Sequence, residues 1–168
     1  MKKNKVAFQG ELGAYSHIAI NELFDNPEIK TCATFEETFK VAFDNEDYKI
    51  VIPLENSLAG RVADIHYLLP KYKLQIYAEH FQEVKHQLLA KKGTTIDEIK
   101  FVRSHSMANG QCQSAIKRLN LTPIVMADTA GSAKHISEIG TNEDSAIASH
   151  LAAEIYGLEI LKSDIQDM

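Results

Sequence analysis

Three short segments gather residue types that can bind a small anion. They are residues 10–17 (GELGAYSH), 53–60 (PLENSLAG) and 104–112 (SHSMANGQC). Each follows an apolar run typical of a strand and supplies glycine, hydroxyl or amide groups where we expect a helix to begin. Unpaired backbone N–H groups and the positive end of the helix dipole favour negative charge at such a position. If the three segments converge, they form a site for a small carboxylate.

The same residues also have ordinary structural interpretations. Gly10 and Gly13 are a common turn signal, and Ser16 is a common residue for capping a helix. Asn56 and Ser57 are also frequent N-cap residues. Taken one at a time, these residues leave both interpretations open. The seven histidines are too scattered for metal-ligand spacing, so we expect no metal site.

Alternating strands and helices must position these segments. Apolar runs predict strands at residues 5–9, 29–33, 49–54, 101–104, 123–126, 145–148 and 158–161. Helical spacing predicts helices at residues 14–24, 35–43, 59–69 (closed by Pro70), 106–119, 131–139 and a last one up to 156. The alternation indicates an α/β fold with a parallel sheet and right-handed crossovers. In open sheets of this kind ligands bind beyond the carboxyl ends of the strands, which is where the three segments lie.

Local signals refine two of these helices. Thr34 followed by Glu37 is the pattern of a capping box, and Phe35, Phe39 and Phe43 form a helical stripe that we expect in the core. Gly157 stands where a glycine would end the last helix.

A change of pattern divides the chain. Residues 74–90 show long, strand-like alternation with few helix signals, so we expect a hinge near Tyr77. This gives a first lobe of about residues 1–76 plus the C-terminal residues and a second lobe of about residues 77–160.

Composition narrows the class of protein. The 168 residues are 45% hydrophobic with a formal net charge of -5, which excludes a disordered chain and disfavours nucleic-acid binding. No apolar stretch approaches the roughly 20 residues of a membrane span, and the run after the basic first residues is too short for a signal peptide. The two cysteines, Cys32 and Cys112, form no metal or disulfide pattern. We expect a cytoplasmic protein with reduced thiols and no membrane or nucleic-acid partner.

The order of the motifs resembles one known family. It runs GxxGxYS, P-x-ENS-x-x-G-x-V, SH-x5-QC, DTAGSA and LAAEIYGLEIL over about residues 5–165. This succession resembles the prephenate dehydratase family. The resemblance implies a hydro-lyase of phenylalanine biosynthesis that converts prephenate to phenylpyruvate, carbon dioxide and water without metal or organic cofactor. It also implies two α/β lobes resembling type II periplasmic binding proteins, an active site in the interlobe cleft, and dimers or larger assemblies.

The resemblance also implies which residues meet the substrate. They are a catalytic set of Asn56, Ser57, Glu55, Ser104 and Gln111, with Thr129 and Ser132 as further substrate-binding candidates. The anion-binding segments themselves add Gly13, Tyr15, Ser16 and His105 to the substrate-binding set. Glu55 and His105 are the titrating groups that can donate a proton. Arg61 and Arg103 can assist in holding a dianion, or can be plain surface charges.

The chain departs from the family pattern in two places. Ala14 stands where members usually have Thr or Ser, and the chain ends at Met168, before the family's Thr-Arg-Phe motif and its regulatory ACT domain. In the family the following segment returns to the first lobe, so we expect an exposed sheet edge there, lower stability and association through that edge. The activity is therefore implied for the parent protein, and whether this catalytic domain of residues 1–168 is active without that motif is left to experiment.

Three alternatives to prephenate dehydratase remain. Arogenate dehydratases carry the same motifs and act on the aminated substrate, and no residue separates the two. The chain can also be a small-carboxylate-binding module that has lost catalysis. A structural or protein-interaction role fits less well, because the polar residues collect at strand ends and not over a surface patch.

Overall fold

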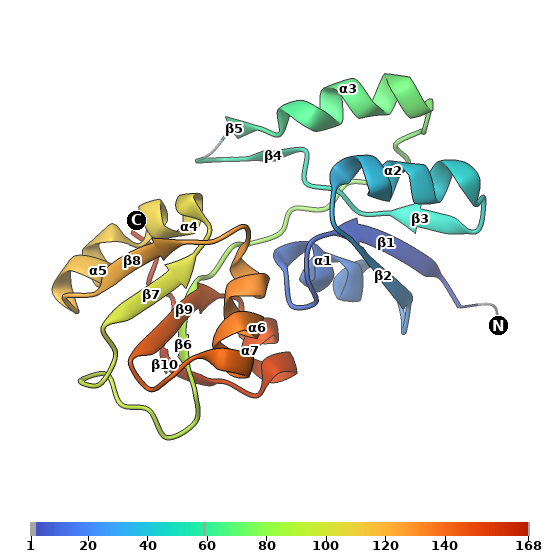
Figure 1. The fold of residues 1–168 in the computed structure, drawn as a ribbon. Helices are drawn as coiled ribbons and strands as arrows, with labels where there is room; N and C mark the ends of the chain where they lie inside the picture. The colour runs from blue at the N-terminus through green and yellow to red at the C-terminus, as the bar shows by residue number, and fades with distance from the viewer. Residues whose placement is uncertain (1–2, 59, 168) are drawn as a thin grey trace. The chain divides into compact units, whose positions relative to one another are not determined.

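The structure is a computed structural model that describes residues 3–58 and 60–167. Contacts divide the chain into two compact α/β units (Figure 1). The first contains residues 3–10 and 15–82, and the second contains residues 11–14 and 83–167. The expected domain's ends, residues 1–2 and 168, and the expected first residue of a helix, Ala59, lie outside the described residues. The boundary between the units lies between Gln82 and Glu83, whereas the sequence pattern predicted a hinge near Tyr77.

A parallel three-stranded sheet forms the first unit. The strand order is β2-β1-β3. The strands are β1 (Lys5–Gln9), β2 (Glu28–Cys32) and β3 (Tyr48–Ile50), and the helices are α1 (Tyr15–Leu23), α2 (Phe35–Asp44) and α3 (Ala63–Tyr72). Val6, Ala7 and Phe8 of the central strand are fully buried. Ala7 packs in a cluster with Val41 of α2, while the Phe8 ring stacks on His17 of α1. Alternate residues of β1 therefore serve the two faces of the sheet.

The structure confirms the predicted N-cap of α2, whereas the prediction that its three phenylalanines lie in the core is only partly correct. The Thr34 hydroxyl accepts a bond from the Glu37 N–H at 3.1 Å, and the Glu37 carboxylate accepts one from the Ala33 N–H at 2.9 Å. Phe39 is fully buried, but Phe43 is 59% exposed and packs edge-on against Tyr72. Residues four apart differ by about 40° around a helix, so Phe43 points away from the direction in which Phe39 is buried.

The segment after β3 differs from the prediction. The predicted strand at 49–54 ends at Ile50, and only the Val51 N–H extends the ladder, to the Ala7 carbonyl at 3.1 Å. The next residues form a small antiparallel hairpin of β4 (Glu55–Asn56) and β5 (Gly60–Arg61). The ENS residues therefore lie in a hairpin and not at a helix start. Pro70 lies inside the last turn of α3, which ends at Tyr72.

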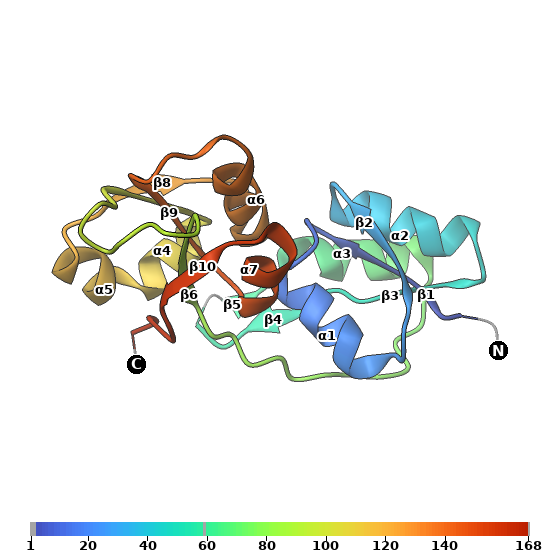
Figure 2. The same cartoon turned by 90° about the horizontal axis from the view of Figure 1, so that it is seen from below.

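A five-stranded mixed sheet forms the second unit, which Figure 2 shows from below. Its order is β10-β6-β9-β7-β8. β7, β8 and β9 are parallel, and β6 is antiparallel to both its neighbours. The strands are β6 (Gln87–Ala90), β7 (Phe101–Ser104), β8 (Thr122–Val125), β9 (Asp144–Ala148) and β10 (Glu159–Lys162). The helices are α4 (Ser106–Gln111), α5 (Gln113–Arg118), α6 (Thr129–Ile139) and α7 (His150–Tyr156).

Two apolar clusters cover the two faces of this sheet. Ile147 of β9 packs with Ala108 and Ile116, which belong to α4 and α5. Its neighbours Ala146 and Ala148 pack with Ile136 of α6 and Ala152 of α7. This alternation is the period of two expected of a strand buried on both faces. The α4–α5 layer and the α6–α7 layer therefore sandwich the sheet.

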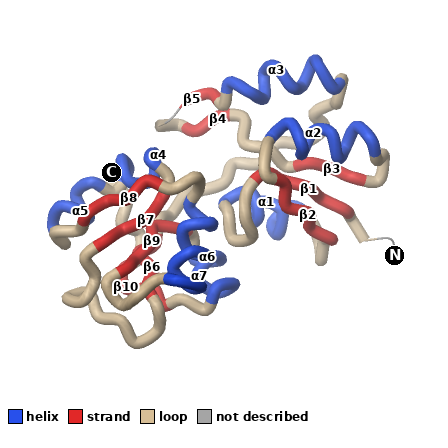
Figure 3. The backbone as a smooth tube through the Cα atoms, in the orientation of Figure 1, coloured by secondary structure: helices blue, strands red, loops and turns tan. Residues whose placement is uncertain are grey.

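The second unit also departs from the sequence prediction in three respects. Of the strand-like stretch 74–90 only residues 87–90 form a strand, and 74–86 run as loop (Figure 3). The helix predicted at 106–119 is broken at Cys112. The C-terminal residues up to 167 belong to the second unit, whereas the sequence interpretation assigned them to the first lobe. They belong there because β10 pairs with β6 and the Ile165 N–H bonds to the His86 carbonyl at 2.9 Å.

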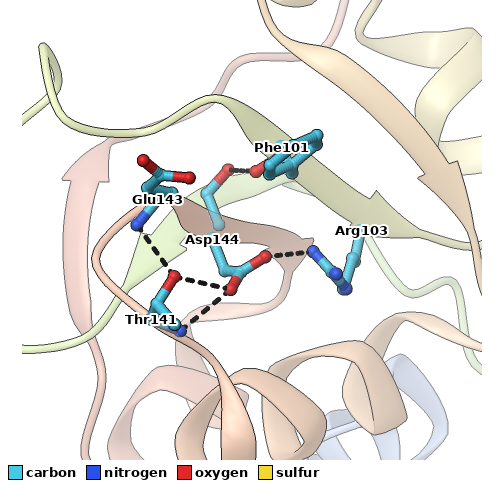
Figure 4. Close-up of polar contacts among 6 residues, drawn as sticks. Phe101, Arg103, Thr141, Glu143 and Asp144 are labelled. Atoms are coloured by element: carbon cyan, nitrogen blue, oxygen red, sulfur yellow. Dashed lines mark hydrogen bonds and ion pairs between the residues drawn. The ribbon is translucent and has the colours of Figure 1, made fainter.

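A nearly buried ion pair joins β7 to β9. The Arg103 guanidinium bonds to Asp144, which also accepts bonds from the Thr141 N–H at 2.8 Å and its hydroxyl at 3.0 Å (Figure 4). The two charged side chains are 18% and 12% exposed. Burial raises the pKa of Asp144, but the bonds from Thr141 and the charge of Arg103 outweigh burial and hold that pKa below its ordinary value. Arg103 is thus bound within the sheet.

Removing this pair should destabilise the fold. We predict that Asp144→Ala lowers the free energy of unfolding by about 3 kcal/mol, because it leaves the Arg103 charge nearly buried and unpaired. The matched control is Glu143→Ala, which removes the adjacent but half-exposed pair with Lys100 and should cost less than about 1 kcal/mol. Equal losses in urea denaturation would contradict the prediction.

Candidate functional site

About half of the polar residues singled out by sequence lie at or near one edge of the second sheet. The parallel strands β7, β8 and β9 end at this edge, and each leads into a helix. The N-cap residues of these helices are His105, Asp128 and Ser149, and the side chain of each accepts a bond from a backbone N–H of its own helix. β6 runs the opposite way, and its first residue Gln87 pairs with Ala148 at the end of β9. The start of β6 therefore lies at the same edge.

Hydroxyl groups at this edge are bound to the backbone. The fully buried Ser104 donates to the Ile147 carbonyl at 2.7 Å, and the fully buried Ser132 donates to the Asp128 carbonyl at 2.6 Å. The hydrogens of both hydroxyls are therefore already used within the fold. Thr129 begins α6 and is half-buried.

The imidazole of His105 is half-buried at the start of α4. Its Nδ1 accepts from the Met107 N–H at 3.3 Å. An accepting Nδ1 carries no hydrogen, so the neutral ring has its hydrogen on Nε2. His105 can therefore present one N–H donor to a ligand.

The loop of residues 11–14 belongs to this edge although its neighbours in sequence belong to the first unit. The Gly13 carbonyl accepts a bond from the Ser149 hydroxyl at 2.5 Å, and the Leu12 carbonyl accepts one from the Tyr156 hydroxyl at 2.8 Å. Glu11 pairs with Lys134 at 3.1 Å. Sequence reasoning singled out neither Ser149 nor Tyr156. Ser149 does stand between a strand and a helix, but its partner is 136 positions away.

Gln111 lies where three chain segments meet. Its side-chain Oε1 is 2.8 Å from Nε2 of His86, which precedes β6. The backbone carbonyl of Gln111 accepts the Asp167 N–H at 2.6 Å. The Ser114 N–H lies 3.2 Å from each of the two carboxylate oxygens of Asp167, which accept it. Burial raises the pKa of the adjacent Cys112 thiol to about 12, with a further contribution from Asp167. That cysteine is therefore a core residue and not a nucleophile.

The first unit carries the remaining predicted residues. Tyr15 and Ser16 begin α1, which follows the carboxyl end of β1. The hairpin after β3 holds Glu55 and Ser57, both exposed, and Asn56, whose Oδ1 accepts the Leu58 N–H at 2.9 Å. Arg61 lies opposite Glu55 in the two-stranded ladder and is exposed.

A shallow hollow beside α6 contains none of the predicted site residues. It is lined by Glu11, Met126, Ala127, Asp128, Gly131, Lys134, His135 and Glu138. Three of these are carboxylates; together with burial, which is the larger effect, they raise the pKa of Tyr156 to about 12. Within residues 3–58 and 60–167 no group of three or more His, Cys, Asp or Glu side chains can hold a metal ion. No helix of the described chain is long and apolar enough to cross a bilayer.

The sequence-predicted residues therefore fall into two groups, one in each unit. Gly13, Ser104, His105, Gln111, Thr129 and Ser132 belong to the second unit, at or near one sheet edge. Tyr15, Ser16, Glu55, Asn56 and Ser57 belong to the first unit, in segments that follow the carboxyl ends of β1 and β3.

Two α/β units of this kind define the class of the protein. The architecture is the periplasmic-binding-protein-like fold that prephenate dehydratase structures share. A family model described as prephenate dehydratase matches residues 6–168, so the chain belongs to the prephenate dehydratase family. This confirms the resemblance that the motifs indicated.

Relatives of known name agree with this assignment. The bifunctional N-acyl-homoserine lactone acylase/prephenate dehydratase of Komagataeibacter europaeus is 43% identical over 96% of this chain and 58% of its own length. The chloroplastic arogenate dehydratase/prephenate dehydratase 2 of Arabidopsis thaliana is 39% identical over 97% of this chain and 43% of its own length. This chain thus spans about half the length of the curated relatives that it matches.

A solved structure supports the fold. The prephenate dehydratase of Arthrobacter aurescens, solved in complex with L-Phe, matches with a TM-score of 0.88 at 24% identity. The match covers 98% of this chain and 56% of that one.

Close packing of the 11–14 loop gives a test of its role. Gly13 has φ of +90°, and a Cβ there would lie 2.7 Å from Cα of Ala152. Gly93 has a similar φ of +82° but open space around it. We predict that Gly13→Ala lowers the free energy of unfolding by about 1–3 kcal/mol more than the control Gly93→Ala, because only Gly13 adds a backbone clash to the conformational strain. Similar denaturation midpoints for the two variants would refute this.

Proposed function

We propose that this chain carries the substrate site of a prephenate dehydratase, which converts prephenate to phenylpyruvate in the biosynthesis of phenylalanine. The observation that carries the proposal is the family match over residues 6–168. The positions of the expected site residues, in segments that follow strand ends in both units, support it.

The reaction needs a positioned dianion and one proton. Prephenate carries two carboxylates and a ring hydroxyl. The C–C bond to the ring carboxylate breaks, its electron pair enters the ring, and the C–O bond to the hydroxyl breaks at the other side. With one proton taken up, the products are phenylpyruvate, carbon dioxide and water. Aromatisation supplies the driving force, so the protein has only to fix the substrate and deliver the proton.

The residues of the site suit this task. The side-chain amides of Asn56 and Gln111 supply N–H donors for carboxylate oxygens, and His105 supplies one from Nε2. Ser104 accepts rather than donates, because its hydrogen is bound to the Ile147 carbonyl. Amides are poor acids, so the proton for the leaving hydroxyl comes from a titrating group, and Glu55 and His105 are our candidates.

Two other activities deserve comparison. The Arabidopsis relative is named for both arogenate and prephenate, so arogenate is the alternative substrate. The Komagataeibacter relative is also named as an acylase. Acyl transfer needs an activated nucleophile, whereas here the hydroxyls of Ser104, Ser132 and Ser149 donate to backbone carbonyls and the pKa of Cys112 is raised to about 12. We therefore expect no acylase activity from these groups.

A direct assay tests the proposal. We predict that the chain forms phenylpyruvate from prephenate at neutral pH faster than an enzyme-free control, and a competition between prephenate and arogenate determines which of the two it prefers. Gln111→Ala and Asn56→Ala should each lower kcat/KM by about 10- to 100-fold, because each removes a donor to the reacting dianion. Gln113→Ala, an exposed glutamine two positions from Gln111, is the matched control and should leave the rate unchanged.

The same assay separates the possible proton donors. The donor is the residue, Glu55 or His105, whose replacement by Gln abolishes turnover while substrate binding persists. Two proteins are assayed: this chain, and a version extended through the Thr-Arg-Phe segment of the family. The proposal is wrong if neither protein turns over prephenate or arogenate.

A further inference from the structure

One buried histidine has no role in the chemistry described so far. His86 is 2% exposed, and its Nε2 lies 2.8 Å from Oε1 of Gln111. Buried polar side chains in contact normally complete each other's hydrogen bonds. What distinguishes this pair is that Gln111 is a residue expected to touch the substrate.

The ring of His86 is attached to a well-held segment of backbone. The backbone N–H of His86 donates to Oε1 of Gln166 at 2.9 Å, and the backbone carbonyl of His86 accepts the Ile165 N–H at 2.9 Å. The next residue, Gln87, begins β6 and pairs with the end of β9. His86 is therefore fixed from both sides and provides a rigid partner for the amide of Gln111.

The chemistry of the two groups determines the direction of the bond. An amide oxygen only accepts, so Nε2 of His86 must carry a hydrogen. Burial lowers the pKa of His86, and the bond to Gln111 offsets this only in part. The imidazole is therefore neutral near pH 7, with its hydrogen on Nε2.

We propose that His86 is a positioning residue that holds the Gln111 side chain with its oxygen turned inward and its NH2 group presented to the substrate. This rests on the proposed function. A substrate with two carboxylates needs donors, and an amide rotated by 180° would offer an oxygen in place of the NH2 group. Without His86 both orientations of the amide are available, and one of them repels the substrate.

Two substitutions of nearly equal size test the proposal. In His86→Gln the new amide nitrogen reaches about where Nε2 stood, whereas in His86→Asn the shorter side chain leaves its nitrogen near the position of Nδ1. We expect kcat/KM for prephenate to fall roughly three- to tenfold in His86→Asn, the worth of one hydrogen bond, and to be largely restored in His86→Gln. Equal losses in the two variants would overturn the proposal.

A double-mutant cycle checks that the effect passes through Gln111. In a Gln111→Ala background, His86→Gln and His86→Asn should have the same kcat/KM, because the group that His86 orients is gone. A difference between them that persists in this background would mean that His86 acts in another way, and would reject the proposal.

Nuclear magnetic resonance provides a readout that does not depend on activity. Long-range ¹H–¹⁵N correlation should show His86 as a neutral ring protonated on Nε2, assigned by the loss of its signals in His86→Gln. The side-chain NH2 resonances of Gln111 should shift in His86→Asn. An unprotonated Nε2 would reverse the bond and overturn the inference. If the parent chain turns over neither substrate, the proposed function fails, while this spectrum still decides the orientation of Gln111.

Discussion

The antiparallel pairing of β6 with β9 is the constraint on which the candidate site of the second unit depends. Parallel β7, β8 and β9 deliver Ser104, Asp128 and Ser149 to one edge of the sheet by the ordinary logic of α/β folds. A parallel β6 would send its first residue to the opposite edge. Because β6 is reversed, Gln87 pairs with Ala148 and the residue before it lies beside the helix that carries Gln111.

The direction of β6 is one of the features of the fold that could not be predicted from sequence, while other elements could. Elements with a short, clear period were found nearly as they are: β1 at residues 5–9, β7 at 101–104, and α2 with its Thr34 cap. The direction of β6 could not be predicted, because an apolar run such as QLLA has no direction until its partners are known. The break at Cys112 and the hairpin at Glu55 were missed for a related reason: tertiary contacts, and not local propensity, determine them.

The candidate site shows the same division. Motif order identified the residues of the GELG, ENS and SH-x5-QC segments, and the structure assigns them to strand ends or to the segments that follow. The residues that hold them were not identified. Ser149 and His86 make their key bonds to Gly13 and Gln111, which are 136 and 25 positions away. No spacing rule reaches such distances, and neither residue is unusual by type. Arg103 shows the opposite case, since a charge that suggested anion binding is bound to Asp144 inside the sheet.

The loop of residues 11–14 has a consequence for how the chain can be divided. It packs with the second unit while the residues on either side pack with the first, so the polypeptide passes between the units three times. A fragment that begins at Glu83 would retain Ser149, Tyr156 and Ala152 but lack the Leu12 and Gly13 groups that they contact. Neither unit is a continuous stretch of sequence. Exchange of one unit between relatives, by recombination or by design, therefore requires two grafts, and a single crossover leaves each hybrid with a loop from the wrong parent.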